Sequence, residues 1–400
     1  MTATSSSSFG SRRCGPPAGP ELAPPAPEPP PLSPLAQRGI GLETRLPARD
    51  PPCTGREELA ADDLLAWRRR QLQSGGRSAD LDWLLEMAGG LPWSVLQQLW
   101  LRPHHPVVLQ CSRIELEAIW RAHLQGNQPL QYLVGCCPWR DMTLAVGPGV
   151  LIPRQETELM VELLLQACRP AGLEANPLQK AEDGLPPRPE PALWADLGTG
   201  SGCLAIALAR AFPESTGLAV DLSGVALAQA VRNLESLGVN RQVRLLRGHW
   251  WDPLEPWWGQ LDLVVANPPY IPSNVVAALD PVVRDHEPWL ALDGGADGLA
   301  CLRSVIHMAP RALAPGGVLL VEHHHDQSRA VLELMAAAGL RHPQAHRDLE
   351  GVPRFVSASR PCDAPGSPSG LRTTGAQAPT GLVSPEALPT SVQSWLHPPQ

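Results

Sequence analysis

The chain has 400 residues, which exceeds one typical domain, so we expect two domains and further segments. Its formal net charge of −8 provides no basic field that would attract DNA or RNA, so no direct nucleic-acid partner is expected. No apolar run approaches the roughly 18 residues of a membrane helix, and no signal-peptide pattern opens the chain. We therefore expect a monomeric cytoplasmic protein without membrane contact. The Ser-rich, acid-free start Met1 to Arg13 leaves targeting to an organelle open.

Cysteine and proline indicate the redox compartment and the segments outside the folded core. The nine cysteines form no CxxC pair and no Cys/His spacing of a zinc site, so we interpret them as ordinary thiols in a reducing compartment. Many of the 46 prolines fall before Pro52, in Leu185 to Pro191 and after Pro361, where apolar periodicity is missing. Residues 1–55 and 361–400 are therefore predicted to be disordered tails, and Leu185 to Pro191 a disordered segment within the chain.

Residues 56–125 contain short stretches with apolar residues at helical spacing, which predict a small helical bundle. The apolar stripes are Leu59, Leu64 and Trp67; Leu81, Leu84, Leu85 and Met87 after the possible cap Ser78; Trp93, Leu96, Leu99 and Trp100; and Ile114, Ile119 and Leu124. Ser112 to Glu115 has the sequence of a capping box that opens the last helix. Helical spacing alone does not separate a plain bundle from a substrate-recognition domain.

Residues 126–150 are expected to form a linker with a hairpin from Gln131 to Val150, and Glu156 to Ala167 a helix. Strands and helices then alternate. The expected strands are Ala192 to Leu197, Thr216 to Val220, Val243 to Leu246, Leu261 to Ala266, Gly316 to Glu322 and Phe355 to Ser357, and the helices are Leu204 to Ala211, Val225 to Leu237 and Ser328 to Ala338. This alternation predicts an α/β fold, a doubly wound Rossmann-like domain over residues 151–360.

A glycine motif follows the first of these strands. Asp196 to Gly202 joins that strand to a helix, and glycines let the backbone approach a ligand whose carboxylate or phosphate binds at the helix start. The second strand ends at Asp221, which lies 19 residues past Gly202 and suits a ribose-binding acid. The motif alone fits a dinucleotide as well as S-adenosylmethionine. The Gly-x-Gly-x-Gly spacing and Asp196 favour S-adenosylmethionine.

The tetrapeptide Asn267-Pro268-Pro269-Tyr270 follows the strand Leu261 to Ala266 and indicates the chemistry. Two prolines lack N–H groups and fix their φ angles, so the loop is stiff and its carbonyls stay outside a ladder. A planar NH₂ group could donate to the Asn267 side-chain oxygen and to the Pro268 carbonyl, with Tyr270 against its plane. Such acceptors would aim an amide nitrogen at a methyl group without a dedicated base. The alternative is a plain turn after a strand, since Asn and Pro are common turn residues.

These residues resemble the release-factor glutamine N5-methyltransferase family over about Glu58 to Val356. The two motifs above are shared with many amino-group methyltransferases. The more specific matches are Gln128 to Gly135, Val150 to Glu158, Glu287-Pro288, Ala291-Leu292 and Gly294 to Leu299.

The resemblance implies methyl transfer from S-adenosylmethionine to the glutamine of the Gly-Gly-Gln motif in a class I peptide chain release factor, which would dock on the N-terminal helical domain. By matching position it implies cofactor contacts at Gly198, Thr199, Gly200, Ser201, Gly202, Asp221, Trp250 and Asn267. It assigns the catalytic contacts with the substrate to Asn267, Pro268, Pro269 and Tyr270.

The chain departs from the family pattern at two places. His249 stands where many members carry an acid before the aromatic, and His323 to His325 replace an apolar residue and a glycine. Adjacent residues at a strand end point to opposite faces, and no carboxylate or Cys motif completes a site, so we expect no metal at the histidines. Cys136 and Cys137 are interpreted as buried small residues. The alternatives to a glutamine methyltransferase are an N6-adenine or N2-guanine methyltransferase and a non-catalytic binding protein.

Overall fold

The computed structural model describes residues 53, 55–168 and 188–362. Both predicted tails therefore lie outside the described residues, apart from Cys53, Gly55, Pro361 and Cys362. Of the segment Leu185 to Pro191, residues 188–191 are described, and there Arg188 Nη2 donates to the Asp262 carbonyl at 2.7 Å. Within the described part, no helix has the length and apolarity needed to cross a membrane.

The N-terminal elements are β1 (Glu57–Ala60), α1 (Ala61–Gln73), α2 (Ser78–Met87), α3 (Trp93–Leu96), the 3-10 helix η2 (Leu99–Leu101), β2 (Pro106–Leu109), α4 (Arg113–Gly126), α5 (Leu130–Val134), β3 (Cys136–Trp139) and β4 (Met142–Ala145). The remaining elements are α6 (Glu158–Ala167), β5 (Leu193–Leu197), α7 (Cys203–Ala211), β6 (Thr216–Asp221), α8 (Gly224–Ser236), β7 (Val243–Arg247), η3 (Asp252–Trp257), β8 (Leu261–Ala266), α9 (Ser273–Val276), α10 (Pro281–Arg284), η4 (Trp289–Ala291), α11 (Ala300–Ala312), β9 (Leu313–Glu322), α12 (Ser328–Ala337), β10 (Arg341–Arg347) and β11 (Pro353–Ser359).

The N-terminal helices share one core, as their spacing predicts. Leu64 and Trp67 of α1, Leu84 of α2 and Trp120 of α4 are buried in the same cluster. Three assignments to this core were wrong, because the side chains of Trp93, Trp100 and Ile114 are exposed. Helical spacing also misses the antiparallel pair β1 and β2, whose four-residue strands are too short for a two-residue period to stand out. Ser78 begins α2 but does not cap it, since Arg77 is the N-cap residue.

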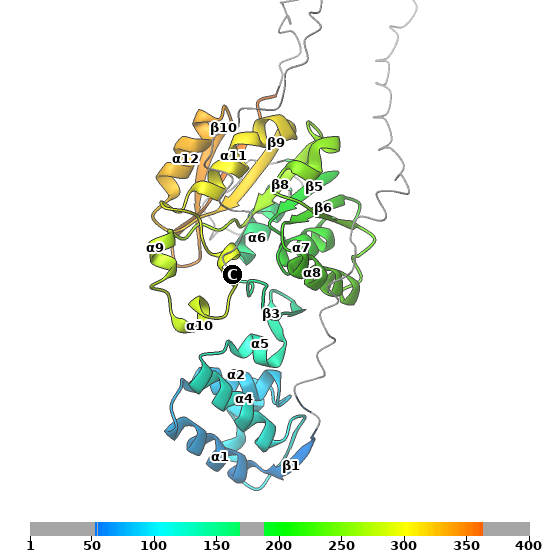
Figure 1. The fold of residues 1–400 in the computed structure, drawn as a ribbon. Coiled ribbons are helices and arrows are strands. Elements are labelled where there is room, and N and C mark those ends of the chain that lie inside the picture. Colours follow the sequence, from blue (N-terminus) through cyan, green and yellow to red (C-terminus); the bar gives the residue numbers. More distant parts are fainter. Residues whose placement is uncertain (1–52, 54, 169–187, 363–400) are drawn as a thin grey trace, which may run out of the picture.

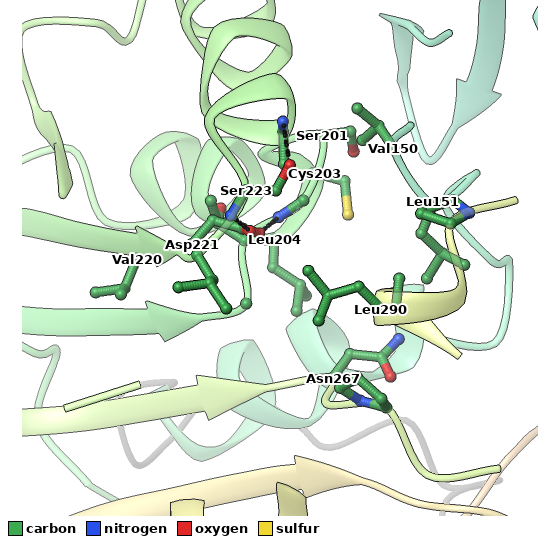
Figure 2. A pocket seen from close by; sticks show the side chains of 18 of the residues that line it. Val150, Leu151, Ser201, Cys203, Leu204, Val220, Asp221, Ser223, Asn267 and Leu290 are labelled. Carbon is green, nitrogen blue, oxygen red and sulfur yellow. Dashed lines mark hydrogen bonds between the residues drawn. The ribbon is translucent and has the colours of Figure 1, made fainter. Parts of the chain in front are cut away.

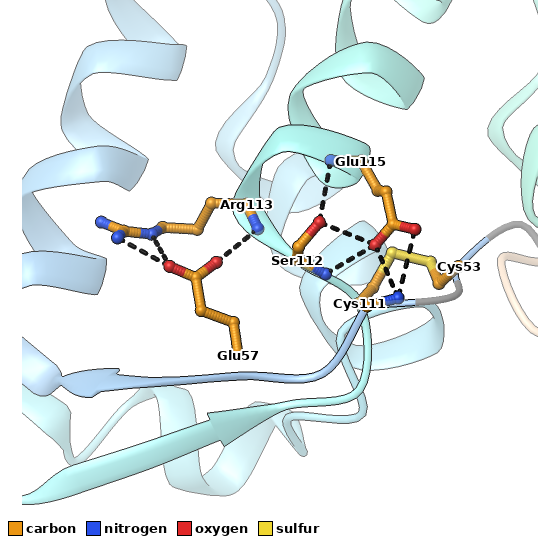
Figure 3. Close-up of a disulfide and its surroundings, with 7 residues drawn as sticks. Cys53, Glu57, Cys111, Ser112, Arg113 and Glu115 are labelled. Carbon is orange, nitrogen blue, oxygen red and sulfur yellow. Dashed lines mark hydrogen bonds and ion pairs between the residues drawn. A yellow bond between two sulfur atoms is a disulfide. The ribbon is translucent and has the colours of Figure 1, made fainter.

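A disulfide joins Cys53 to Cys111, directly before the capping box of α4 (Figure 3). The predicted box is confirmed: the Ser112 hydroxyl accepts from the Glu115 N–H, and the Glu115 carboxylate accepts from the Ser112 N–H. The interpretation of all cysteines as ordinary thiols was wrong for this pair. The reason is that the β1 and β2 strands bring two cysteines together that are 58 residues apart in the chain.

The predicted linker hairpin is confirmed for β3 and β4, which pair antiparallel. Its first part was wrong, because Leu130–Val134 is the short helix α5. Pro129 is the N-cap of α5, and Gly135 ends it in the left-handed conformation with φ of 86°. Cys137 is buried as expected, and Cys136 is half-buried.

Seven strands form the central sheet in the order β10, β11, β9, β8, β5, β6, β7. Figure 1 shows β9, β8, β5 and β6 in the middle of this domain. The strands β5 to β9 pair in parallel, and β11 and β10 extend the sheet with antiparallel pairs. The predicted doubly wound domain is therefore confirmed. The longest of the missed elements are α11, which contains Pro310 near its end, and the edge strand β10, whose sequence is mostly polar. The short helices η3, α9, α10 and η4 were missed as well.

Both faces of the sheet are covered, because its strands are apolar on both sides. On β5, Trp194 packs into the core under α6, α7 and α8, whereas its neighbour Ala195 packs into the core under α11 and α12. The strand order reverses between β5 and β8, which are adjacent although two strands, two α-helices and the 3-10 helix η3 separate them in the chain. A crevice opens at the carboxyl ends of the strands at such a point.

We predict that the Cys53–Cys111 disulfide stabilises the N-terminal helices. Closing a loop of 58 residues restricts the unfolded chain by about 4 kcal/mol in the chain-entropy model. Cys53→Ser combined with Cys111→Ser should therefore lower the free energy of unfolding by about 2–4 kcal/mol, measured by urea unfolding without reductant. Thiol titration of the denatured wild-type protein should find two more thiols after reduction than before. Equal thiol numbers would contradict the disulfide.

Candidate active site

A cavity lies in the crevice at the reversal of the strand order, with Asp221 and Asn267 at the ends of β6 and β8 (Figure 2). Its walls come from the turn after β5, the loops after β6, β7 and β8, and the segment before α6. Of the predicted site residues it is lined by Gly198, Thr199, Gly200, Ser201, Asp221, Trp250, Asn267 and Pro269. Gly202, Pro268 and Tyr270 do not line it, although they belong to the same two loops.

The glycine turn requires residues without a side chain at three positions. Gly198, Gly200 and Gly202 have φ values of 79°, 56° and 84°, in the left-handed region that favours glycine. A Cβ at Gly200 would have the Gly198 carbonyl oxygen, 4.0 Å away, as its nearest neighbour, so the space beside this residue is open. Ligand atoms can therefore approach the backbone of the turn.

Asp196 ends up buried at the start of this turn. Its Oδ2 accepts a hydrogen bond from the Thr199 hydroxyl at 2.7 Å, while its Oδ1 has no partner among the described residues. Burial raises the pKa of Asp196 to about 7, against the lowering effect of the Thr199 hydrogen bond. A positive charge bound near the turn would compensate the buried carboxylate.

Asp221 ties the end of β6 to the glycine turn. Its Oδ2 accepts from the Gly200 N–H and its Oδ1 from the Ser223 N–H, both at 2.8 Å. Burial raises the pKa of Asp221, and the backbone hydrogen bonds act in the opposite direction. Each carboxylate oxygen keeps a further lone pair, so the side chain can accept two more hydrogen bonds from a ligand.

Trp250 closes the cavity beside the turn. Its backbone has φ of 46°, a value uncommon for a bulky residue, and its ring packs against Gly198 so closely that a Cβ there would lie 3.3 Å from the ring. His249 lines the same wall. The histidine that departs from the family pattern therefore does not displace the aromatic ring from the cavity.

Asn267 is held by Thr157, which also lines the cavity, and through Thr157 by Glu322. Thr157 lies within the matched segment Val150 to Glu158, but the sequence assigned no role to either residue. Asn267 Nδ2 donates to the Thr157 hydroxyl at 3.0 Å, and that hydroxyl donates to Glu322 Oε2 at 2.7 Å. The Tyr270 hydroxyl donates to Glu322 Oε1 at 3.0 Å. No donor among the described residues bonds the Asn267 side-chain oxygen or the Pro268 carbonyl.

The segment before α6 is anchored to the loop that follows the tetrapeptide. Glu287, which is buried, accepts from Arg154 Nη2 at 2.7 Å and from the Ile152 N–H at 3.2 Å. These contacts join the two segments that resemble the family's specific motifs, and Arg154 lines the cavity. In the sequence, only the resemblance of these two segments to the family indicated Arg154 and Glu287.

The three histidines after Glu322 are arranged differently from the prediction. β9 ends at Glu322, so strand alternation does not apply to them. The rings of His324 and His325 lie 4.1 Å apart between centroids, and Asp326 Oδ1 is 2.7 Å from His324 Nδ1. The argument that their side chains diverge and lack a carboxylate was therefore wrong.

The chain is similar in sequence to several known proteins. A family model described as "Methyltransferase small domain" matches residues 186–285. A "Release factor glutamine methyltransferase" of Prochlorococcus marinus is 49% identical over 303 residues, which cover 76% of this chain and 98% of that protein. One of Synechocystis is 39% identical over 309 residues, 75% of this chain and 97% of that protein.

A solved "protein-(glutamine-N5) methyltransferase (release factor-specific)" from Alicyclobacillus acidocaldarius is 25% identical, with a TM-score of 0.30, over 55% of this chain and 99% of that chain. The sequence relatives carry the assignment, because they match almost over their whole length. The chain belongs to the family of release factor glutamine methyltransferases, and it is an enzyme of the methyltransferase class.

Proposed function

We propose that this enzyme transfers a methyl group from S-adenosylmethionine to the side-chain amide nitrogen of the glutamine in the Gly-Gly-Gln motif of a class I release factor. The observation that carries the proposal is that the glycine turn, Asp221 and Asn267 line one cavity. This cavity combines features suited to a nucleoside-containing cofactor with an acceptor suited to a planar NH₂ group. Membership of the family favours a protein glutamine over a nucleic-acid base as the methyl acceptor.

The described residues fit the methyl donor. The open space at Gly200 admits its methionine part to the backbone. Asp196 is buried at the start of the same turn, where a positive charge nearby would favour its carboxylate form. Asp221 keeps lone pairs for the ribose hydroxyls, and Trp250 offers an apolar wall for the base. When bound, the cofactor supplies a methyl group on a positively charged sulfur atom.

Asn267 and Pro268 would orient the substrate amide. The amide nitrogen is a weak nucleophile because its lone pair is delocalised into the carbonyl. Two acceptors, the Asn267 side-chain oxygen and the Pro268 carbonyl, can each take one of its N–H bonds and so fix the direction of the nitrogen. The proton becomes acidic only after methylation and can then leave to water, so no dedicated base is needed.

We further propose that residues 56–125 bind the release factor. The enzyme would then act in the compartment where translation terminates. The exposed apolar side chains of this region support the proposal. Trp93 and Trp100 are 55% and 69% exposed, and aromatic residues on a surface often anchor a protein partner.

The first test is the methylation of a purified class I release factor. Incubation of the enzyme with S-adenosylmethionine and the release factor should add a single methyl group, which peptide mapping by mass spectrometry should find on the glutamine of the Gly-Gly-Gln motif. A release factor carrying Ala in place of that glutamine serves as the control and should stay unmodified. Methylation of nucleic acid alone, or of nothing, would refute the proposed function.

The second test separates the roles of Asn267 and Asp221. Asn267→Ala should keep the cofactor Kd within a few fold but lower turnover by about 10² or more, because it removes one preorganised acceptor. Asp221→Asn should mainly weaken cofactor binding, by about tenfold, since it turns one acceptor oxygen into a donor. Isothermal titration and single-turnover assays measure the two effects. Unchanged turnover in Asn267→Ala would remove Asn267 from the catalytic site.

The third test concerns the docking surface. Trp100→Ser should raise the KM for the release factor by about tenfold and leave the cofactor Kd unchanged, because it removes an aromatic anchor. Leu349→Ser is the matched control, since Leu349 is 94% exposed on the turn between β10 and β11. Equal KM values for the two variants would exclude Trp100 from the docking surface.

A further inference from the structure

A buried chain of hydrogen bonds leads from Glu322 to the proposed substrate acceptor. Asn267 donates to Thr157, and Thr157 donates to Glu322. Thr157 and Glu322 are only 2% and 1% exposed, so water cannot readily replace these contacts. The three residues come from separate parts of the fold: the end of β8, the start of α6 and the end of β9.

The direction of this chain follows from the number of protons. A carboxylate can only accept hydrogen bonds, so the single hydroxyl proton of Thr157 is committed to Glu322. The Thr157 oxygen can then only accept a hydrogen bond from Asn267, which must turn its NH₂ group toward Thr157. The Asn267 side-chain oxygen consequently points away from Thr157 and remains available as an acceptor.

The reversed chain would be unsuited to the substrate. If the Thr157 hydroxyl donated to the Asn267 oxygen, the NH₂ group of Asn267 would take the place of that acceptor. It would then face the NH₂ group of a glutamine side chain, and two donors cannot form a hydrogen bond. The two orientations of an amide have nearly the same shape, so packing does not distinguish them.

Thr157 precedes α6 with helical backbone angles (φ −61°, ψ −22°), so its hydroxyl is free of the usual capping role. The side-chain oxygen of a threonine at this position commonly accepts a hydrogen bond from the first turn of the helix. Thr157 is the N-cap of α6, but its side chain makes no capping hydrogen bond. Its hydroxyl contacts Glu322 and Asn267 instead.

We propose that Glu322 and Thr157 are positioning residues that fix the Asn267 amide with its oxygen toward the substrate. The proposal rests on the proposed function, because it deepens the role given there to Asn267. Glu322 also accepts from the Tyr270 hydroxyl, so one carboxylate holds both ends of the tetrapeptide Asn267 to Tyr270.

The pKa of Glu322 determines the pH at which the proposal should be tested. Burial raises its pKa to about 7, against the lowering effects of Thr157, Tyr270 and Arg354, and Glu156 raises it further. A protonated Glu322 could donate to Thr157 and permit the reversed chain. Assays at about pH 8 therefore favour the carboxylate form.

The main test compares Thr157→Val with Thr157→Ser. Valine keeps the shape of threonine but has no hydroxyl, so turnover on the release factor should fall about tenfold or more, with little change in the cofactor Kd. Serine keeps the hydroxyl, so turnover should stay within about threefold of the wild type. Glu322→Gln should also lower turnover, because an amide can present an NH₂ group to Thr157 and permit the reversed chain. Equal turnover in Thr157→Val and Thr157→Ser would overturn the proposal.

A double-mutant cycle excludes a merely structural role. In an Asn267→Ala background no amide remains to be oriented, so Thr157→Val should lower turnover no further. A full additional loss in that background would show that Thr157 acts through stability or another contact, and would contradict the proposal. Melting temperatures of all variants report on folding.

A measurement without the release factor distinguishes this proposal from the proposed function. NMR can follow the side-chain NH₂ group of Asn267, whose signal is identified by its loss in Asn267→Ala. The protons of this group should exchange with solvent at least about tenfold faster in Thr157→Val than in Thr157→Ser. This result would support the hydrogen-bond chain even if the wild-type enzyme left the release factor unmethylated, an outcome that refutes the proposed function alone. Equal exchange rates in the two variants would refute the chain.

Discussion

The reversal of strand order between β5 and β8 is the constraint on which the site depends. The two strands pair in parallel, so their carboxyl ends lie at the same edge of the sheet. The helix after β5 covers one face, whereas α11, which precedes β9, covers the other. The glycine turn and the tetrapeptide therefore diverge from one edge, and the cavity lies between them.

A second constraint acts behind the cavity wall. Glu322 is a fully buried acid, and a buried charge is costly unless hydrogen bonds compensate it. Two hydroxyl groups, from Thr157 and Tyr270, donate to its two oxygens. The same contacts connect β9, the start of α6 and the loop after β8. We infer that the hydrogen bonds that offset the cost of burying Glu322 also make the Asn267 acceptor rigid.

The sequence predicts much of the fold because its signals are local. The glycine turn and the apolar runs of β5, β6 and β8 each identify an element within a few residues, and the structure confirms them. The polar edge strand β10 and the four-residue strands β1 and β2 carry no such signal. Trp93, Trp100 and Ile114 have the spacing of core residues but are exposed. Trp93 and Trp100 lie on two short elements, α3 and η2, so one helical period does not describe them. For Ile114 on α4, periodicity does not reveal how wide the buried face of the helix is.

The candidate site, like the fold, is predictable only where a local sequence signal exists. Asp221 and Asn267 follow apolar strands, so their positions at the sheet edge can be derived from the sequence. Thr157 and Glu322 are 165 residues apart, and Thr157 and Asn267 are 110 apart, so no local pattern reveals their contacts. The Cys53–Cys111 pair was missed for the same reason.

The central claim is that Asn267 presents an oxygen atom to the substrate amide. A crystal structure with S-adenosylhomocysteine and a Gly-Gly-Gln peptide tests it most directly. The account predicts that the glutamine NH₂ group lies within hydrogen-bond distance of the Asn267 side-chain oxygen and the Pro268 carbonyl, while Asn267 Nδ2 stays bonded to Thr157. A glutamine side chain bound elsewhere in the cavity, or another loop between it and the cofactor sulfur, would contradict the account.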